Sequence, residues 1–116
     1  MDDMNIQAVE ELLSLEFYRF KRYKIPITLV LIIIDNRNFF ATAEAKIRKT
    51  DLIQQIDRDL YAILYTHTDA AGARVAIDNI LEILGDDKGS FTLAVEEADY
   101  HDASEHELIA RAFGKL

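Results

Sequence analysis

The chain has 116 residues and no cysteine, so it is long enough for one small domain, and disulfides and zinc–thiolate sites are excluded. Half of the residues are hydrophobic, which is enough for a core without covalent cross-links. The net charge of −8 repels nucleic acid and anionic lipid on average, so neither is an expected partner.

The N-terminal residues and the longest apolar run argue against export and membrane insertion. Residues 1–4 are acidic and polar, whereas a signal peptide starts with basic residues. The apolar run over residues 25–34 includes Pro26 and Thr28 and has about ten residues, too few to span a bilayer. We therefore expect a cytoplasmic protein with no membrane insertion.

The first expected element is a helix over residues 5–24. Its apolar side chains recur at spacings of three and four residues, which predicts one buried face. This stripe consists of Val9, Leu12, Leu13, Phe17, Phe20 and Tyr23. Pro26 ends the helix, because the residue before a proline avoids the helical region. Residues 27–34 are a continuous apolar run, which predicts a strand buried on both faces.

Three elements are expected in the middle of the chain. Residues 39–48 are rich in alanine, which favours a short helix after the turn signal at residues 36–38. Residues 52–56 and 60–66 are two apolar segments on either side of three charged residues. They predict two strands joined as a hairpin.

The remaining residues predict a helix, a strand and a second helix. Thr68 is expected to cap the first of these helices, and Gly85 to end it. Residues 90–95 predict a fourth strand. Ser104 and Glu107 have the spacing of a capping box, which predicts the start of the last helix.

The predicted order is helix, then strand–helix–strand–strand–helix–strand, then helix. This order is typical of an α+β fold in which a ferredoxin-like antiparallel sheet of about four strands packs against helices. No repeat, linker or low-complexity tract interrupts the chain. We therefore expect a single domain over residues 1–116.

Short segments spread along the chain carry a family resemblance. Residues 16–29 read Glu-x-x-Arg-x-x-Arg-Tyr-x-x-Pro-x-Thr-Leu, and residues 48–51 read Arg-x-x-Asp. Residues 57–61 read Asp-Arg-Asp-Leu-Tyr, and residues 107–112 read Glu-Leu-Ile-Ala-Arg-Ala. In order and spacing these segments resemble the GGDEF domain of bacterial diguanylate cyclases. The resemblance covers nearly the whole chain and implies a palm-like core over residues 27–116 behind the N-terminal helix.

The resemblance places a degenerate segment at the family's signature loop, Gly-Gly-Asp/Glu-Glu-Phe. The residues that stand there are Asp57, Arg58, Asp59, Leu60 and Tyr61. In the family the two glycines let the backbone lie close to the nucleotide, a space that Asp57 and Arg58 are expected to fill, with Asp57 bringing negative charge towards a phosphate. The family's metal-binding glutamate is Leu60 here, which cannot ligate a metal.

A remnant of the family's metal site is expected at Asp35, which matches the carboxylate that ends the first strand. Arg37 and Phe40 stand where the family has a second aspartate and a lysine. Asp35 could instead cap the turn that follows the strand. These losses predict a protein that is not an enzyme, with no cofactor and no bound metal.

Arg48 and Asp51 match the family's product-inhibition site in residue type and in their offset from the signature. A guanidinium binds phosphate or a guanine edge, and a carboxylate accepts from guanine N–H groups, so the pair is a candidate site for cyclic di-GMP. Such a site needs a second arginine, for which Arg74, Arg22 and Arg19 are the candidates. The alternative is an ion pair at the end of a helix.

Two hypotheses for the function remain open at this stage. The first is a catalytically inactive signalling domain that senses cyclic di-GMP through Arg48 and Asp51. The second is a protein-interaction or dimerisation module without a nucleotide ligand, in which the helix over residues 5–24 forms a homodimer or contacts a partner signalling protein.

Overall fold

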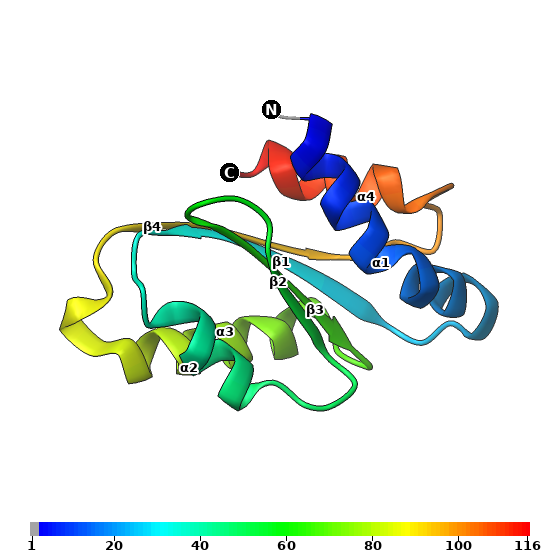
Figure 1. Ribbon diagram of the computed structural model, residues 1–116. Coiled ribbons are helices and arrows are strands. Elements are labelled where there is room, and N and C mark those ends of the chain that lie inside the picture. Colours follow the sequence, from blue (N-terminus) through cyan, green and yellow to red (C-terminus); the bar gives the residue numbers. More distant parts are fainter. Residues whose placement is uncertain (1–2) are drawn as a thin grey trace.

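The computed structural model describes residues 3–116, which form one four-stranded antiparallel sheet between two layers of helices (Figure 1). The strand order is β2-β3-β1-β4, so the two strands that are central in the sheet are the first and the third along the chain. The strands are β1 (Ile27–Ile34), β2 (Leu52–Gln55), β3 (Leu60–Thr66) and β4 (Phe91–Glu97). The helices are α1 (Asp3–Tyr23), α2 (Phe39–Lys46), α3 (Ala70–Leu84) and α4 (Glu105–Gly114), with a short 3₁₀ helix, η1 (Gly85–Lys88), after α3. The predicted fold class is confirmed.

The strands alternate between two hydrophobic cores, one on each face of the sheet. On β1, Leu29 and Leu31 pack under α1 and α4, while Val30 and Ile32 pack against α2 and α3. This alternation is why a strand covered on both faces reads as a continuous apolar run. The one departure is Ile33, which is exposed near the end of the strand.

Helix α1 buries the predicted stripe with one exception. Val9, Leu13 and Phe17 are buried, but the Tyr23 side chain is 60% exposed, so its assignment to the stripe is wrong. The helix ends there because Lys24 adopts a positive φ of 58° and Pro26 follows. Tyr23 therefore lies beyond the last turn that contacts the sheet.

The helix caps differ from the prediction in detail. Asp69, not Thr68, is the N-cap of α3, and its carboxylate accepts a hydrogen bond from the Gly72 N–H. Ser104 is the N-cap of α4, but its hydroxyl makes no capping hydrogen bond. Glu107 instead accepts from the N–H of residue 103, one position before the cap. Gly85 ends α3 at a φ of 69°, as predicted for a residue without Cβ.

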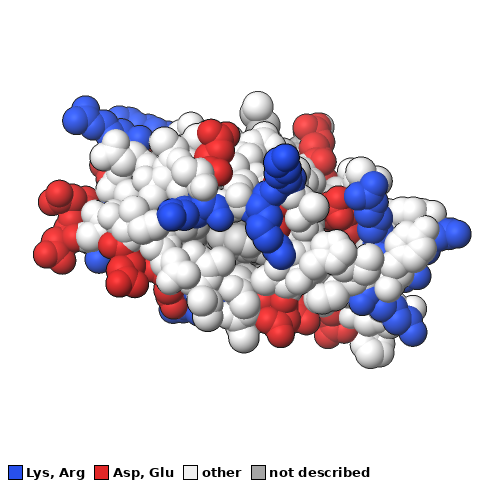
Figure 2. Space-filling view, turned by 90° about the horizontal axis from the view of Figure 1, so that it is seen from below, with Lys and Arg blue, Asp and Glu red and all other residues white. Residues whose placement is uncertain are grey.

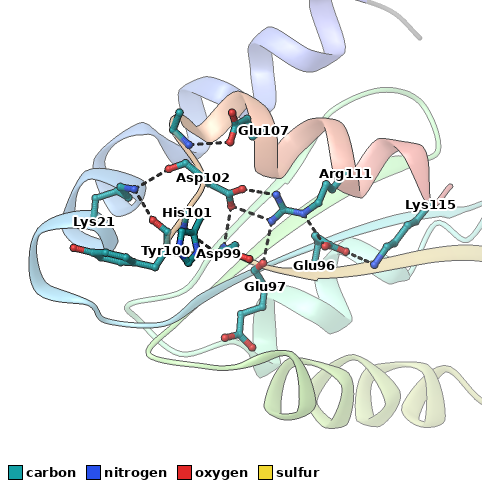
Figure 3. A network of polar contacts seen from close by, with 11 residues as sticks. Lys21, Glu96, Glu97, Asp99, Tyr100, His101, Asp102, Glu107, Arg111 and Lys115 are labelled. Atoms are coloured by element: carbon teal, nitrogen blue, oxygen red, sulfur yellow. Dashed lines mark hydrogen bonds and ion pairs between the residues drawn. The ribbon is translucent and has the colours of Figure 1, made fainter.

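A network of polar contacts fastens the loop after β4 to α4 and α1 (Figure 3). The Arg111 guanidinium donates from both terminal nitrogens to the carboxylate of Asp102, and its Nε donates to Glu96 at 2.9 Å. Lys115 pairs with the same glutamate. Lys21 of α1 donates to the Asp102 carbonyl oxygen at 2.8 Å. The network thus joins α1 to the β4–α4 segment, which lies about 80 residues later in the sequence.

Within residues 3–116, no helix combines the length and the apolar character needed to cross a membrane.

Candidate functional site

Two of the hollows on the side of the sheet that α2 and α3 cover contain residues that the sequence singled out. The first, at the end of β1 and beside the β2–β3 hairpin, has a volume of about 400 Å³. It is lined by Asp35, Asn36, Arg37, Phe40, Gln55, Arg58, Asp59 and Tyr61. This cleft brings together most of the residues that the sequence singled out around the degenerate signature.

The cleft holds four charged side chains that balance in sign. Asp35, Arg37, Arg58 and Asp59 form no ion pair with one another or with other residues between 3 and 116. The Tyr61 hydroxyl lies near both carboxylates, and its pKa is raised by burial, then by Asp59 and Asp35. The charges therefore face solvent and are available to a ligand.

The second hollow lies at the other end of β3 and contains the Arg48–Asp51 pair. Arg48 Nε and Nη2 donate to the two carboxylate oxygens of Asp51, each at 3.0 Å, which is a bidentate ion pair. The Arg48 and Asp51 side chains are 54% and 1% exposed, respectively. Both residues line the hollow, and the ion pair at the end of a helix that the sequence offered as the alternative is present.

Asp51 can be buried because two backbone N–H groups take up its remaining acceptor capacity. Its Oδ1 accepts from the Thr66 N–H at 2.9 Å, and its Oδ2 accepts from the Arg48 N–H at 2.9 Å. Burial raises the pKa of this carboxyl, but the hydrogen bonds from Arg48 and Thr66 outweigh burial and hold the pKa below its usual value. Asp51 is thus a charged anchor for the chain between α2 and β2.

Arg48 keeps one donor group free. Its Nη2 also donates to the carbonyl oxygen of Thr66 and to the Thr68 hydroxyl, whereas its Nη1 has no partner among residues 3–116. Asp51 raises the pKa of the guanidinium, mainly through their hydrogen bond. This bonding also explains why Thr68 does not cap α3, because its hydroxyl donates to the carbonyl oxygen of Thr66 and accepts from Arg48.

No family profile and no curated protein match this chain, but solved structures do. The active GGEEF domain of a diguanylate cyclase from Vibrio cholerae matches with a TM-score of 0.78 at 14% identity, over 93% of this chain and 85% of that one. The chain has the fold of a GGDEF domain. The GGDEF domain of DgcB from Caulobacter crescentus, in complex with c-di-GMP, also has a TM-score of 0.78, at 12% identity over 93% and 77% of the chains. Diguanylate cyclase SiaD from Pseudomonas aeruginosa, in complex with its activator SiaC, matches with a TM-score of 0.77 at 15% identity, over 98% and 55%.

On this fold the residues of the segment 57–61 are divided between the two faces of the sheet. Arg58, Asp59 and Tyr61 line the cleft, while Leu60 packs in the core under α1 and α4. Asp57 accepts a hydrogen bond from the Asn5 side chain of α1 at 3.1 Å and does not line the cleft. Of the two residues that stand at the family's glycines, Arg58 lines the cleft and Asp57 does not.

The residues of the cleft do not fit a divalent metal ion. Asp35 and Asp59 are the acidic groups present, and the guanidinium groups of Arg37 and Arg58 line the same space. Two nearby cations oppose the binding of a third. Within residues 3–116, no three His, Asp or Glu side chains gather as a metal site would require. Asp35 does not cap the turn either, since the Asn38 N–H donates to Asn36.

Reasoning from the sequence missed the residues that surround Arg48. The hollow there has a volume of about 260 Å³ and is lined by Lys46, Arg48, Asp51, Tyr65, Thr68, Gly72 and Ala76. Tyr65 could have been suspected, because it lies four residues after Tyr61 on the same strand and so points to the same face. Lys46 was marked in the sequence only by its basic neighbours Arg48 and Lys49.

Proposed function

We propose that this chain is a catalytically inactive signalling domain with the GGDEF fold. The observation that carries the proposal is Leu60, which stands at the position of the family's metal-binding glutamate and is buried in the core under α1 and α4. Arg37 and Arg58 in the cleft add to this, because they oppose the metal-bound triphosphate chemistry of an active cyclase. A single-domain organisation and a cytoplasmic location stay predictions.

The direct test of inactivity is GTP turnover with magnesium or manganese. We expect no cyclic di-GMP above the level of a protein-free control. A restored variant, Leu60→Glu with Arg58→Gly, is the informative comparison, provided that both proteins are shown to be folded. Product formation by the unmodified chain would overturn the proposal.

Within this proposal, Arg48 is the contact for cyclic di-GMP. Its half-exposed guanidinium is held in one orientation by Asp51, and solved GGDEF domains of similar fold occur in complex with c-di-GMP. Asp51 then acts by positioning Arg48, since its own oxygens are already occupied. Ligand binding would crosslink two copies or hold the domain against a partner, and so shift an existing equilibrium.

The energetics require more than Arg48. One charge-assisted hydrogen bond contributes about 1.5–3 kcal/mol, whereas micromolar affinity corresponds to about 8 kcal/mol. Arg74 lies on α3, on the same side of the sheet, and is exposed. Arg19 and Arg22 lie on α1 across the sheet, so they would have to come from a second copy.

Calorimetry with cyclic di-GMP, using GTP as the control ligand, tests this site. We expect micromolar binding that Arg48→Ala abolishes and that Lys49→Ala, an exposed neighbour, leaves unchanged. Because Arg48 also pairs with the buried Asp51, the unfolding free energy of each variant must be measured in parallel. If the unmodified chain does not bind cyclic di-GMP, the proposal of this ligand at Arg48 fails. The proposal of a catalytically inactive domain is unaffected.

A second candidate function, a protein-interaction or dimerisation module, is favoured by the outer surface of α1. Leu15, Tyr18 and Tyr23 are large apolar side chains that stay exposed there. Analytical ultracentrifugation without nucleotide should then show a dimer that Leu15→Glu dissociates. A monomer at high concentration would count against a homodimer and direct attention to another protein partner.

A further inference from the structure

The Tyr65 hydroxyl is a buried polar group without a partner. Tyr65 is 4% exposed, and its oxygen forms no hydrogen bond with any residue between 3 and 116. Burial, and then the charge of Asp51, raises its pKa to about 12, so the hydroxyl keeps its proton at neutral pH and remains a donor. Buried hydroxyls in folded proteins are normally paired, so an unpaired one indicates a missing partner.

The hydroxyl lies at the wall of the hollow that contains Arg48. Tyr65 lines this hollow, and its hydroxyl is close enough to Asp51 and Arg48, which line it too, for their charges to act on it. Gly72 at the start of α3 also lines it, but the Gly72 N–H is already bonded to Asp69. Donors to a ligand must therefore come from side chains.

The side chains that line the hollow carry a net positive charge, although the chain as a whole has a negative net charge. Its ionisable side chains other than tyrosine are Lys46, Arg48 and Asp51, two cations and one anion, whereas the chain as a whole carries −8. The charge of Asp51 is already compensated by Arg48 and by the Thr66 N–H. Figure 2, which views the molecule from the side of α2 and α3, shows separate basic side chains among acidic ones and no continuous basic surface. Such a spot suits a small anion better than a long polyanion.

We propose that this hollow binds a phosphate group, with Lys46, the free Nη1 of Arg48 and the Tyr65 hydroxyl as its donors. A tetrahedral oxyanion accepts hydrogen bonds from several directions at once, and a phosphomonoester offers three terminal oxygens to these three donors, whereas a phosphodiester offers two. The ligand class is therefore a phosphomonoester, in contrast to the phosphodiesters of a cyclic dinucleotide. This inference rests on the same Arg48 as the proposed function. It goes beyond that function by naming another class of ligand and two further donors, Lys46 and Tyr65.

The shielding of the Tyr65 oxygen fits a ligand-induced contact. The oxygen is out of reach of solvent, so contact with a phosphate requires a local movement of the residues that line the hollow. Lys46 is exposed and forms no ion pair with residues 3–116, so it is free to move. Binding then gives the hydroxyl the partner that it lacks.

Inorganic phosphate, titrated by calorimetry and followed by ³¹P line broadening, is the probe that tests this site. Thermal stabilisation alone is not suitable, because phosphate stabilises most proteins through exclusion from their surface. We expect Tyr65→Phe and Lys46→Ala each to weaken phosphate binding by about tenfold, as for the loss of one hydrogen bond to a charged group. The matched controls, Tyr18→Phe on α1 and Lys49→Ala, should bind as the unmodified chain does.

The outcomes separate this inference from the proposed function. Phosphate binding that Tyr65→Phe weakens, with no binding of cyclic di-GMP, would support the phosphate site and remove cyclic di-GMP as the ligand of Arg48. Equal phosphate binding by Tyr65→Phe, Lys46→Ala and the unmodified chain would overturn the phosphate site. So would the absence of phosphate binding by the unmodified chain, even if cyclic di-GMP binds.

Discussion

Two arginine–aspartate pairs, Arg48–Asp51 and Arg111–Asp102, anchor loops at different corners of this molecule. In both pairs the carboxylate is buried, with side-chain exposures of 1% for Asp51 and 5% for Asp102, and both carboxylates also accept a backbone N–H. The arginines differ. All three nitrogens of the Arg111 guanidinium have acceptors, whereas Nη1 of Arg48 has none among residues 3–116.

This difference distinguishes an ion pair that is only structural from one that can also bind a ligand. Around Arg111 every guanidinium nitrogen has an acceptor, and Lys115 forms an ion pair with Glu96 at the outer edge of the network (Figure 3). Around Arg48, by contrast, Nη1 of the arginine and the buried Tyr65 hydroxyl have no partner among residues 3–116. Both lie beside a hollow that a ligand can enter. Unpaired donors next to a space of ligand size are the physical sign of a site.

The largest effect is expected from Arg111→Met. This change leaves the buried Asp102 without its cation and removes one of the two cations beside Glu96. We expect the free energy of unfolding to fall by about 3 kcal/mol, because uncompensated buried charges are costly. Urea denaturation measures the change. Arg74→Met is the control, since its pair with Asp78 is exposed on both sides and should contribute no more than about 0.5 kcal/mol.

The same variant should change the acid dependence of stability. Burial raises the pKa of Asp102 and of Glu96, but contacts with Arg111, and for Glu96 first with Lys115, outweigh it and lower both pKa values. A lowered pKa gives stability that is complete above the unfolded value, about 4, and is lost as the pH falls through the folded value.

The stability difference between the unmodified chain and Arg111→Met should therefore be largest at pH 7 and shrink towards pH 3. Urea denaturation at a series of pH values measures it. A difference that stays constant with pH would mean that Arg111 contributes by packing rather than by charge.

A smaller effect is expected from Arg48→Met. Asp51 keeps the backbone N–H groups of residues 48 and 66 when the guanidinium is lost, so the unfolding free energy should fall by only about 1–2 kcal/mol. Chemical denaturation beside Arg111→Met measures the ratio of the two effects. An effect as large as that of Arg111→Met would show that Arg48 is mainly structural and would weaken both proposals for its hollow.

Much of the fold was predictable from the sequence because its signals are local. Residues 27–34 and 60–66 have the predicted strand limits, since each is a dense apolar run bounded by turn or polar residues. The spacing of apolar residues in α1 predicted its buried face except at Tyr23, where the helix ends.

The site was less predictable because its contacts join distant residues. Asp57 bonds to Asn5, which is 52 positions away, and Asp51 bonds to the backbone of Thr66, 15 positions away. No local spacing signals such contacts. The Tyr65 hydroxyl becomes notable only when the packing around it leaves it unpaired, which the sequence does not express.

The smallest effect, and one of opposite sign, is expected from Tyr65→Phe in the absence of ligand. This substitution removes a buried hydroxyl that has no partner, so the unfolding free energy should stay the same or rise by up to about 1 kcal/mol. Thr66→Val is the matched control, because the neighbouring buried hydroxyl donates to the Thr50 carbonyl oxygen at 3.0 Å. Its loss should cost about 1 kcal/mol. If Tyr65→Phe is destabilised as much as Thr66→Val, the tyrosine hydroxyl has a partner in the folded protein, such as a bound water, and the contrast between the two arginine corners becomes weaker.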